Sequence, residues 1–196
     1  MELIMFVGIP ASGKSTQSEK YRQQGYLVLS SDEIRERLLA QADLEAMTGK
    51  ERSNIHSRVF EQIRNRTAEA LKQGRSVVVD ATNLGRKRRM NFLSHFGRIP
   101  CVKKCVLFIT PAEICMERNR KRTGIARVPD TGVYRMLCNF ECPNYWEGWD
   151  EIIPVIDHTS YQFPFCEVKG FSQDNPHHNL TLDQRKGSGK DGRIHY

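Results

Sequence analysis

The chain has 196 residues, with 30 lysines and arginines against 23 aspartates and glutamates, a formal net charge of +7 and a mean hydropathy of −0.56. This length allows one α/β domain whose core needs no disulfides, followed by a tail. No apolar run approaches the length that crosses a membrane and no signal peptide precedes the first apolar segment, so we expect a cytoplasmic protein without a membrane partner.

Short apolar runs alternate with longer amphipathic segments, which predicts an α/β fold with a parallel sheet of about five strands and helices on both faces. Strands are expected at 2–7, 26–30, 76–80, 103–109 and 152–156. Helices are expected at 14–24, 32–41, 50–73, 86–96, 111–122 and 129–140. The regular pattern fades after residue 157. We therefore expect a domain over 1–157 and an irregular tail over 158–196, with its last residues disordered.

The cysteines are scattered over the second half of the chain, at Cys101, Cys105, Cys115, Cys138, Cys142 and Cys166. Two C-x-x-x-C spacings raise the possibility of zinc, but structural zinc sites favour C-x-x-C turns or paired Cys and His ligands. Cys105 and Cys115 also lie in or beside apolar runs. We interpret the cysteines as reduced thiols of the core.

The segment GIPASGKS, Gly8 to Ser15, followed by Thr16, matches the phosphate-binding loop G-x-x-x-x-G-K-[ST] between an apolar strand and a helix. Backbone N–H groups, the helix N-terminus and the Lys14 ammonium would hold a polyphosphate, and the Ser15 hydroxyl would bind Mg²⁺. The expected nucleotide contacts come from Gly8, Ala11, Ser12, Gly13, Lys14, Ser15 and Thr16. The pattern predicts binding of ATP or GTP. The competing interpretation is a glycine-rich turn with a surface lysine.

Ligands of an open parallel sheet bind beyond the carboxyl ends of its strands. After the second predicted strand comes SSDEIR, residues 30–35. One interpretation is a helix N-terminus with a capping box of Ser30 and Glu33. The other makes Asp32 a general base for an attacking hydroxyl and Arg35, one turn later, a ligand of an acceptor phosphate. The sequence leaves both open.

After the third predicted strand comes DATNLG, residues 80–85. Asp80 is a candidate to hold a Mg²⁺-bound water, as the acid after this strand does in P-loop enzymes. Alternatively, Asp80 or Asn83 caps the next helix. Both roles are compatible with each other.

Two basic runs follow. RKRR, residues 86–89, opens a helix at the end where the dipole favours acids, so we interpret it as a contact to a phosphate backbone, with a solvated charge run as the alternative. Residues 118–127 then carry five cations within ten positions. This density predicts a basic lid over nucleotide phosphates, with one arginine stabilising the transferring phosphoryl group.

In this order the segments resemble the P-loop polynucleotide 5′-hydroxyl kinases, within the wider AAA_33 and zeta-toxin-like group of P-loop phosphotransferases. The resemblance covers about residues 1–157 and depends on GIPASGKST, SDEIR, DATNL with RKRR, and ERNRKRTG with RVP. It implies a P-loop NTPase-type kinase that uses ATP and Mg²⁺ and acts on a 5′-hydroxyl end of RNA or DNA. It also implies that Asp32 is the general base, that Arg35 contacts the acceptor phosphate, and that Arg122, supported by Arg118 and Arg127, reaches the donor phosphates.

The sequence departs from the resemblance in two places. Relatives can carry Asp-Thr-Asn after the third strand, whereas here Ala81 follows Asp80, which leaves the role of Asp80 open. Residues 171–182 (FSQDNPHHNLTL) resemble the start of an HD-type domain that some related kinases carry, so the tail is expected to be a truncated start of one. His177 and His178 are not assigned as metal ligands.

Other functions are compatible with the same motifs. The chain could be a kinase of a small molecule, a nucleoside or a sugar nucleotide, or a module that hydrolyses ATP without transferring its phosphate. It could also be a basic nucleic-acid binder with an inert P-loop. Tyr134, Trp146 and Trp149 are interpreted either as base-stacking aromatics or as core residues.

Overall fold

The computed structural model describes residues 1–40 and 49–157. The chain divides into two units, Met1–Ser160 and Tyr161–Tyr196, and the described residues all belong to the first. The predicted tail over 158–196, with Cys166, His177 and His178, lies outside the described residues. The predicted domain boundary at residue 157 and the truncated HD-type start therefore stay predictions.

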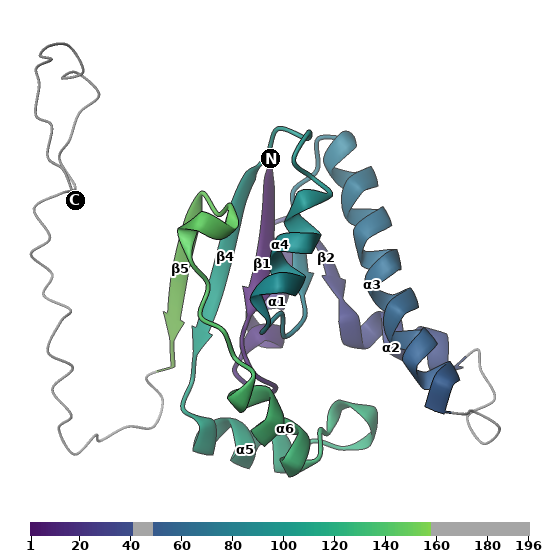
Figure 1. Cartoon of the computed structure of the whole chain (residues 1–196), viewed down its shortest axis with the longest axis vertical. Coiled ribbons are helices and arrows are strands. Elements are labelled where there is room, and N and C mark those ends of the chain that lie inside the picture. Colours follow the sequence, from purple (N-terminus) through teal and green to yellow (C-terminus); the bar gives the residue numbers. More distant parts are fainter. Residues whose placement is uncertain (41–48, 158–196) are drawn as a thin grey trace, which may run out of the picture. The chain divides into compact units, whose positions relative to one another are not determined.

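In the described part of the chain, five parallel strands form one sheet in the order β2-β3-β1-β4-β5 (Figure 1). Their bounds are Glu2–Val7 for β1, Leu27–Ser30 for β2, Val77–Asp80 for β3, Val102–Ile109 for β4 and Glu151–Ile156 for β5. This confirms the predicted α/β fold with its parallel sheet, and each strand lies within one residue of its predicted bounds. The central strands β1 and β3 are near-continuously apolar and buried because both faces of the sheet are covered there, whereas the edge strand β5 is mostly exposed.

The predicted helices are also present, with ends that differ by at most two residues. They are α1 at Lys14–Gln23, α2 at Ser31–Ala40, α3 at Gly49–Lys72, α4 at Arg86–Ser94, α5 at Ala112–Arg120 and α6 at Asp130–Cys138. Two short 3₁₀ turns, η1 at Gly124–Ala126 and η2 at Tyr145–Glu147, lie between the later elements.

The alternation of β1 divides the core between the two faces of the sheet. Leu3 and Met5 belong to a large cluster that includes buried residues of α2, α3 and α4. Ile4 and Phe6 point to the opposite face, where they pack with residues that include Tyr21 of α1. Successive strand residues point to opposite faces, so one buried strand anchors helices on both sides. The carboxyl ends of all five strands consequently meet at one edge.

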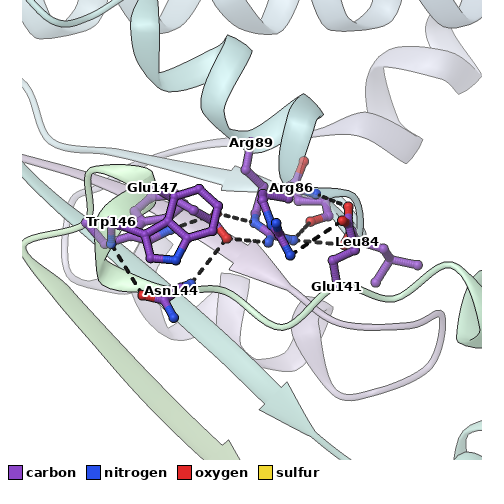
Figure 2. A network of polar contacts seen from close by, with 9 residues as sticks. Leu84, Arg86, Arg89, Glu141, Asn144, Trp146 and Glu147 are labelled. Carbon is purple, nitrogen blue, oxygen red and sulfur yellow. Dashed lines mark hydrogen bonds and ion pairs between the residues drawn. The ribbon is translucent and has the colours of Figure 1, made fainter. Parts of the chain in front are cut away.

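A buried ion pair ties α4 to the turn η2 (Figure 2). Arg89 donates from Nε and Nη2 to the two carboxylate oxygens of Glu147, each at 2.7 Å. Its Nη1 donates to the carbonyls of Asn83 at 3.1 Å and Leu84 at 2.8 Å. Both charged side chains are 0% exposed. The hypothesis that the whole run 86–89 contacts a phosphate backbone is therefore wrong for Arg89, because protein acceptors already surround its guanidinium.

The N-terminus of α4 receives its acid from a distant part of the chain. The Arg86 backbone N–H donates to Glu141 Oε2 at 2.7 Å, and the Arg86 guanidinium lies 4.8 Å from the centre of the Trp146 ring (Figure 2). The residue in the cap position is Gly85, which offers no side chain. The prediction that Asp80 or Asn83 caps this helix is therefore wrong. Glu141 supplies the negative charge that the helix dipole favours, so the basic run breaks no electrostatic rule.

The described cysteines form no disulfide. Cys105 and Cys115 are buried, as predicted, and burial raises the pKa of their thiols to about 12 and about 11. Cys138 and Cys142 are exposed, so the prediction of core thiols is wrong for this pair. Within residues 1–40 and 49–157, no group of three or more His, Cys, Asp and Glu side chains is arranged to hold a metal ion.

Candidate active site

The loop between β1 and α1 has the backbone shape of a phosphate cradle. Ala11 and Gly13 adopt left-handed conformations, with φ of 63° and 95°. At Gly8 an added Cβ would lie 2.7 Å from Ser12 Oγ and 2.9 Å from Phe108 Cβ, so only glycine fits there. No side chain caps the N-terminus of α1, whose first N–H groups have no acceptor within the helix. These groups are therefore available to an anion.

The turn after β3 is fastened to this loop. The Gly8 N–H donates to the Thr82 carbonyl at 3.1 Å, and Asn83 Nδ2 donates to the Phe6 carbonyl at 2.8 Å. Asn83 has a φ of 47°, a conformation that asparagine tolerates better than most residues. DATN therefore links the end of β3 to the end of β1 and fixes Asp80 beside the loop.

Lys14 is buried against the loop that precedes it. Its ammonium donates to the carbonyls of Gly8 at 3.0 Å and Ile9 at 2.6 Å, and to Ser12 Oγ at 3.3 Å. Burial lowers the pKa of Lys14 to about 8, because the charged form loses hydration, and attraction to Asp80 offsets only part of this.

Asp80 ends β3 with its carboxylate buried. Its Oδ2 accepts a hydrogen bond of 2.5 Å from Ser18 Oγ, one turn along α1 from Lys14. Burial raises the pKa of Asp80, whereas the Ser18 hydrogen bond and the charge of Lys14 act in the opposite direction. Ser18 was not among the predicted site residues. Its position four residues after Lys14, on the same helical face, was the available signal.

Asp32 and Arg35 form an ion pair on the first turns of α2, with Arg35 Nη1 2.6 Å from Asp32 Oδ1. The Asp32 side chain is 66% exposed. The Glu33 N–H donates weakly to Ser30 Oγ at 3.4 Å, while the Glu33 carboxylate pairs with Arg22 of α1. Of the two hydrogen bonds of a capping box, only the one accepted by Ser30 is present. The carboxylate of Asp32 remains accessible.

A cleft of about 290 Å³, here called the central cleft, brings together candidate residues from all these segments. They include Ala11, Lys14, Ser15, Asp32, Arg35, Asp80, Thr82 and Arg122. His56 and Phe60 of α3 and Arg88 of α4 line the same cleft and were not predicted as site residues. Phosphate loop, candidate base, acid and lid arginine thus share one space.

A second cleft of about 650 Å³, here called the β5-side cleft, lies on the other side of the phosphate loop. Its lining includes Ser12, Gly13, Thr16, Arg118, Arg122 and Asp157. Arg122 lines both clefts. A triphosphate held by the loop could therefore extend into this space with its nucleoside, while its terminal phosphate faces the central cleft.

The cations of the predicted lid differ in their partners. Arg118 pairs with Asp157 at 2.5 Å, Arg120 with Asp130 at 2.9 Å and Lys121 with Glu117 at 2.6 Å. Arg122 has no side-chain partner among the described residues. Arg127 is exposed and lines neither cleft. Of the three predicted lid arginines, the structure places Arg122 at both clefts and Arg118 at one.

The donor set fits a Mg²⁺ ion shared with phosphates. Ser15 and Asp80 line the central cleft together and offer a hydroxyl and a carboxylate. Mg²⁺ is usually held by one or two protein oxygens plus substrate phosphates and water, and not by a cage of protein ligands. The fit therefore depends on the nucleotide as a partner ligand.

The three aromatic candidates differ in how far their side chains are exposed. Trp149 is 4% exposed and belongs to the core, which agrees with one of its two interpretations. Trp146 is 56% exposed but covers the Arg86 guanidinium, and Tyr134 on α6 is 65% exposed.

Comparison with known proteins decides the family. Residues 3–143 match AAA_33, described as an AAA domain. The chain belongs to this family. Its fold resembles that of a candidate kinase from Chloroflexus aurantiacus, with a TM-score of 0.65 and 16% identity over 79% of this chain and 84% of that one. A sugar kinase from Janibacter sp. HTCC2649 gives a TM-score of 0.55 at 16% identity, over 80% of this chain and 85% of that one.

One curated relative, the transcription factor bHLH140 of Arabidopsis thaliana, is 34% identical over 90 residues, which are 43% of this chain and 10% of that protein. The chain thus spans about a tenth of the length of this relative. The AAA_33 domain of this chain has a P-loop fold like that of these two structures. None of its described helices is long and apolar enough to cross a membrane.

Proposed function

We propose that this AAA_33 domain is an ATP- and Mg²⁺-dependent kinase that transfers the γ-phosphoryl group to the 5′-hydroxyl of a polynucleotide, RNA or DNA. One observation carries the proposal. Lys14, Asp32, Arg35, Asp80 and Arg122 come from distant segments and line a single cleft at the carboxyl ends of the strands. A module that binds a nucleotide but transfers no phosphoryl group does not need a carboxylate and an arginine such as Asp32 and Arg35 in the same cleft as the phosphate loop.

The donor half of the site holds the triphosphate. The N–H groups of the loop and the Lys14 ammonium bind the β- and γ-phosphates, and Thr16 and Arg118 line the space for the rest of the nucleotide. Ser15 and Asp80 would hold Mg²⁺, which would supply positive charge to offset the negative charge on the phosphates during transfer. Asp80 keeps its place through the hydrogen bond that it accepts from Ser18.

The acceptor half aligns an alcohol. Asp32 accepts the proton of the 5′-hydroxyl as its oxygen bonds to the γ-phosphorus, while the bond from that phosphorus to the β–γ bridging oxygen breaks and ADP leaves. Arg35 pairs with Asp32 through Nη1 and keeps further N–H groups for the phosphate next to the hydroxyl. A phosphate beside the reactive hydroxyl is what a polynucleotide offers.

Arg122 stands between the two halves. Because it lines both clefts and has no ion-pair partner among the described residues, its guanidinium can contact the phosphoryl group in transfer. An arginine in this role stabilises charge on the equatorial oxygens. The supporting role of Arg127 requires its side chain to turn towards the central cleft, which its neighbours Ala126 and Val128 already line.

The test supplies γ-labelled ATP together with 5′-hydroxyl RNA and DNA oligonucleotides, a nucleoside, and a sugar. We expect label on the oligonucleotide 5′ end, and transfer slowed by about 10²- to 10⁴-fold after Asp32→Asn. Label on the nucleoside or sugar alone would replace the polynucleotide by a small acceptor. Release of labelled phosphate with no labelled acceptor, unchanged by Asp32→Asn, would make the domain an ATP-hydrolysing module.

A further inference from the structure

A basic groove lies between α3 and α4, outside the central cleft. It has a volume of about 620 Å³ and is lined by residues that include His56, Phe60, Arg64, Lys87, Arg88 and Asn91. Every charged side chain that lines it in the described part of the chain is basic. Its volume is within the range of sites that hold a small organic ligand, so it has room for roughly one or two nucleotides.

The groove is continuous with the central cleft. His56, Phe60 and Arg88 line both spaces. Burial and the positive charges of Arg88 and Arg35 lower the pKa of His56, which reflects how closely these groups approach across the junction. An acceptor whose 5′ end meets Asp32 and Arg35 would therefore leave the central cleft along this groove.

The groove offers both surfaces that a nucleic-acid strand needs. The Arg88 guanidinium lies 5.1 Å from the centre of the Phe60 ring, and the His56 and Phe60 rings are 4.9 Å apart. Aromatic rings and guanidinium planes stack on bases of any sequence. Arg64 and exposed Lys87 line the two walls, one from α3 and one from α4, and can contact successive phosphates.

We infer that the α3–α4 groove binds the second and following nucleotides of a single-stranded acceptor, with bases at His56 and Phe60 and backbone phosphates at Arg64 and Lys87. This assignment rests on the proposed function. It explains why α4 keeps Arg88 and Lys87 at its surface while Arg89 is turned into the core. It also gives the domain a means of preferring a strand to a mononucleotide.

The test uses the double variant Arg64→Ala/Lys87→Ala, with Lys72→Ala/Arg75→Ala as the matched control. The control removes the same charge from exposed positions outside the groove, one at the last residue of α3 and one just after the turn that follows it. Binding of a ten-nucleotide 5′-hydroxyl strand, labelled at its 3′ end, is measured by fluorescence anisotropy over a range of salt. Kinase kinetics are measured with this strand and with a nucleoside 3′-monophosphate, which is too short to enter the groove.

Two lost phosphate contacts reduce the slope of log K against log salt by about 1.4, which is a loss of about 25-fold in affinity at 0.1 M salt. We expect this loss for the strand in the groove variant alone, with unchanged kcat and KM for the nucleoside 3′-monophosphate. If the strand is phosphorylated but the groove and control variants bind it equally, the groove assignment is wrong and the proposed function stands. If no strand is phosphorylated by the unaltered protein, the proposed function itself fails.

Discussion

Two arginine–carboxylate pairs of the described chain differ in almost every physical respect. Arg89 and Glu147 are 58 positions apart, fully buried, and joined by two hydrogen bonds of 2.7 Å. Asp32 and Arg35 are three positions apart on one helix, with side chains 66% and 31% exposed, joined by a bond of 2.6 Å. The first pair connects two segments that are distant along the chain. The second pair connects two residues that already lie one turn apart on the same helix.

The two arginines differ in how many of their guanidinium N–H groups remain available for a further hydrogen bond. Arg89 directs Nε, Nη1 and Nη2 at protein oxygens, so its charge serves the fold. Through these bonds it holds the carbonyls of Asn83 and Leu84, next to the turn that carries Asp80. Arg35 uses Nη1 for Asp32, and no other side-chain bond to a described residue is present. A buried pair of this kind stabilises geometry, whereas an exposed pair is available for a substrate.

Breaking the buried pair should give the largest change in stability. We expect Arg89→Ala to lower the free energy of unfolding by about 3–5 kcal/mol, because it leaves the Glu147 carboxylate buried without its partner. Urea denaturation followed by circular dichroism measures this. Lys87→Ala, an exposed residue of the same helix, is the control, with a change of no more than about 0.5 kcal/mol. Equal effects of the two substitutions would mean that the pair adds nothing to the fold.

Breaking the exposed pair should leave the fold intact and change acceptor selection. Arg35→Ala should weaken use of a 5′-hydroxyl strand by about 10- to 150-fold, since a hydrogen bond to a charged group contributes about 1.5–3 kcal/mol. A nucleoside without a phosphate should lose little. Steady-state kinetics with both acceptors measure the difference, with Arg37→Ala on the same helix as control. A similar loss for both acceptors would contradict a phosphate-binding role.

The buried Lys14 provides a pH test on the donor side. Burial lowers its pKa to about 8, so the neutral form becomes populated above that value, while a phosphate favours the charged form. Affinity for ATP should therefore fall as pH rises through about 8, by roughly tenfold at pH 9 relative to pH 7. Calorimetry at pH 8 in buffers of different ionisation enthalpy should show uptake of about half a proton. If proton uptake on ATP binding persists in the Lys14→Met variant, a group other than Lys14 titrates.

The smallest expected effect concerns the acid at the start of α4. Glu141→Gln keeps a hydrogen-bond acceptor for the Arg86 N–H but removes the charge beside the helix N-terminus. We expect a loss of about 0.3–1 kcal/mol in the free energy of unfolding, which salt should reduce. Thermal unfolding at low and high salt measures it, with Glu69→Gln on exposed α3 surface as reference. A loss independent of salt would mean that shape, not charge, matters at this end.

The sequence was sufficient for the features that depend on local pattern. Alternating apolar runs located the strands, and the fixed spacing around Lys14 located the phosphate loop. It was insufficient where the partner is far along the chain. Nothing near residues 86–89 indicates that Glu141 and Glu147 approach them, so adjacent arginines appeared equivalent. A helix turns by about 100° per residue, which sends Arg88 to the surface and Arg89 into the core.

The same limit applies to the acceptor side of the candidate site. Asp32 and Arg35 follow a strand and could be expected at the edge of the sheet, but His56 and Phe60 lie in the middle of a long helix. Their place at the central cleft depends on how α3 packs against α2 and α4, which no local motif encodes. Ser18 was overlooked because a serine inside a helix carries no signal until its partner Asp80 is in view.

The central claim is that Asp32 aims an acceptor hydroxyl at a triphosphate held by the phosphate loop. Single-turnover transfer from γ-labelled ATP to a 5′-hydroxyl oligonucleotide, with ATP binding measured in parallel, tests it most directly. Asp32→Asn should slow transfer by about 10²- to 10⁴-fold and leave ATP affinity and thermal stability unchanged. Transfer at the unaltered rate in that variant would contradict the account.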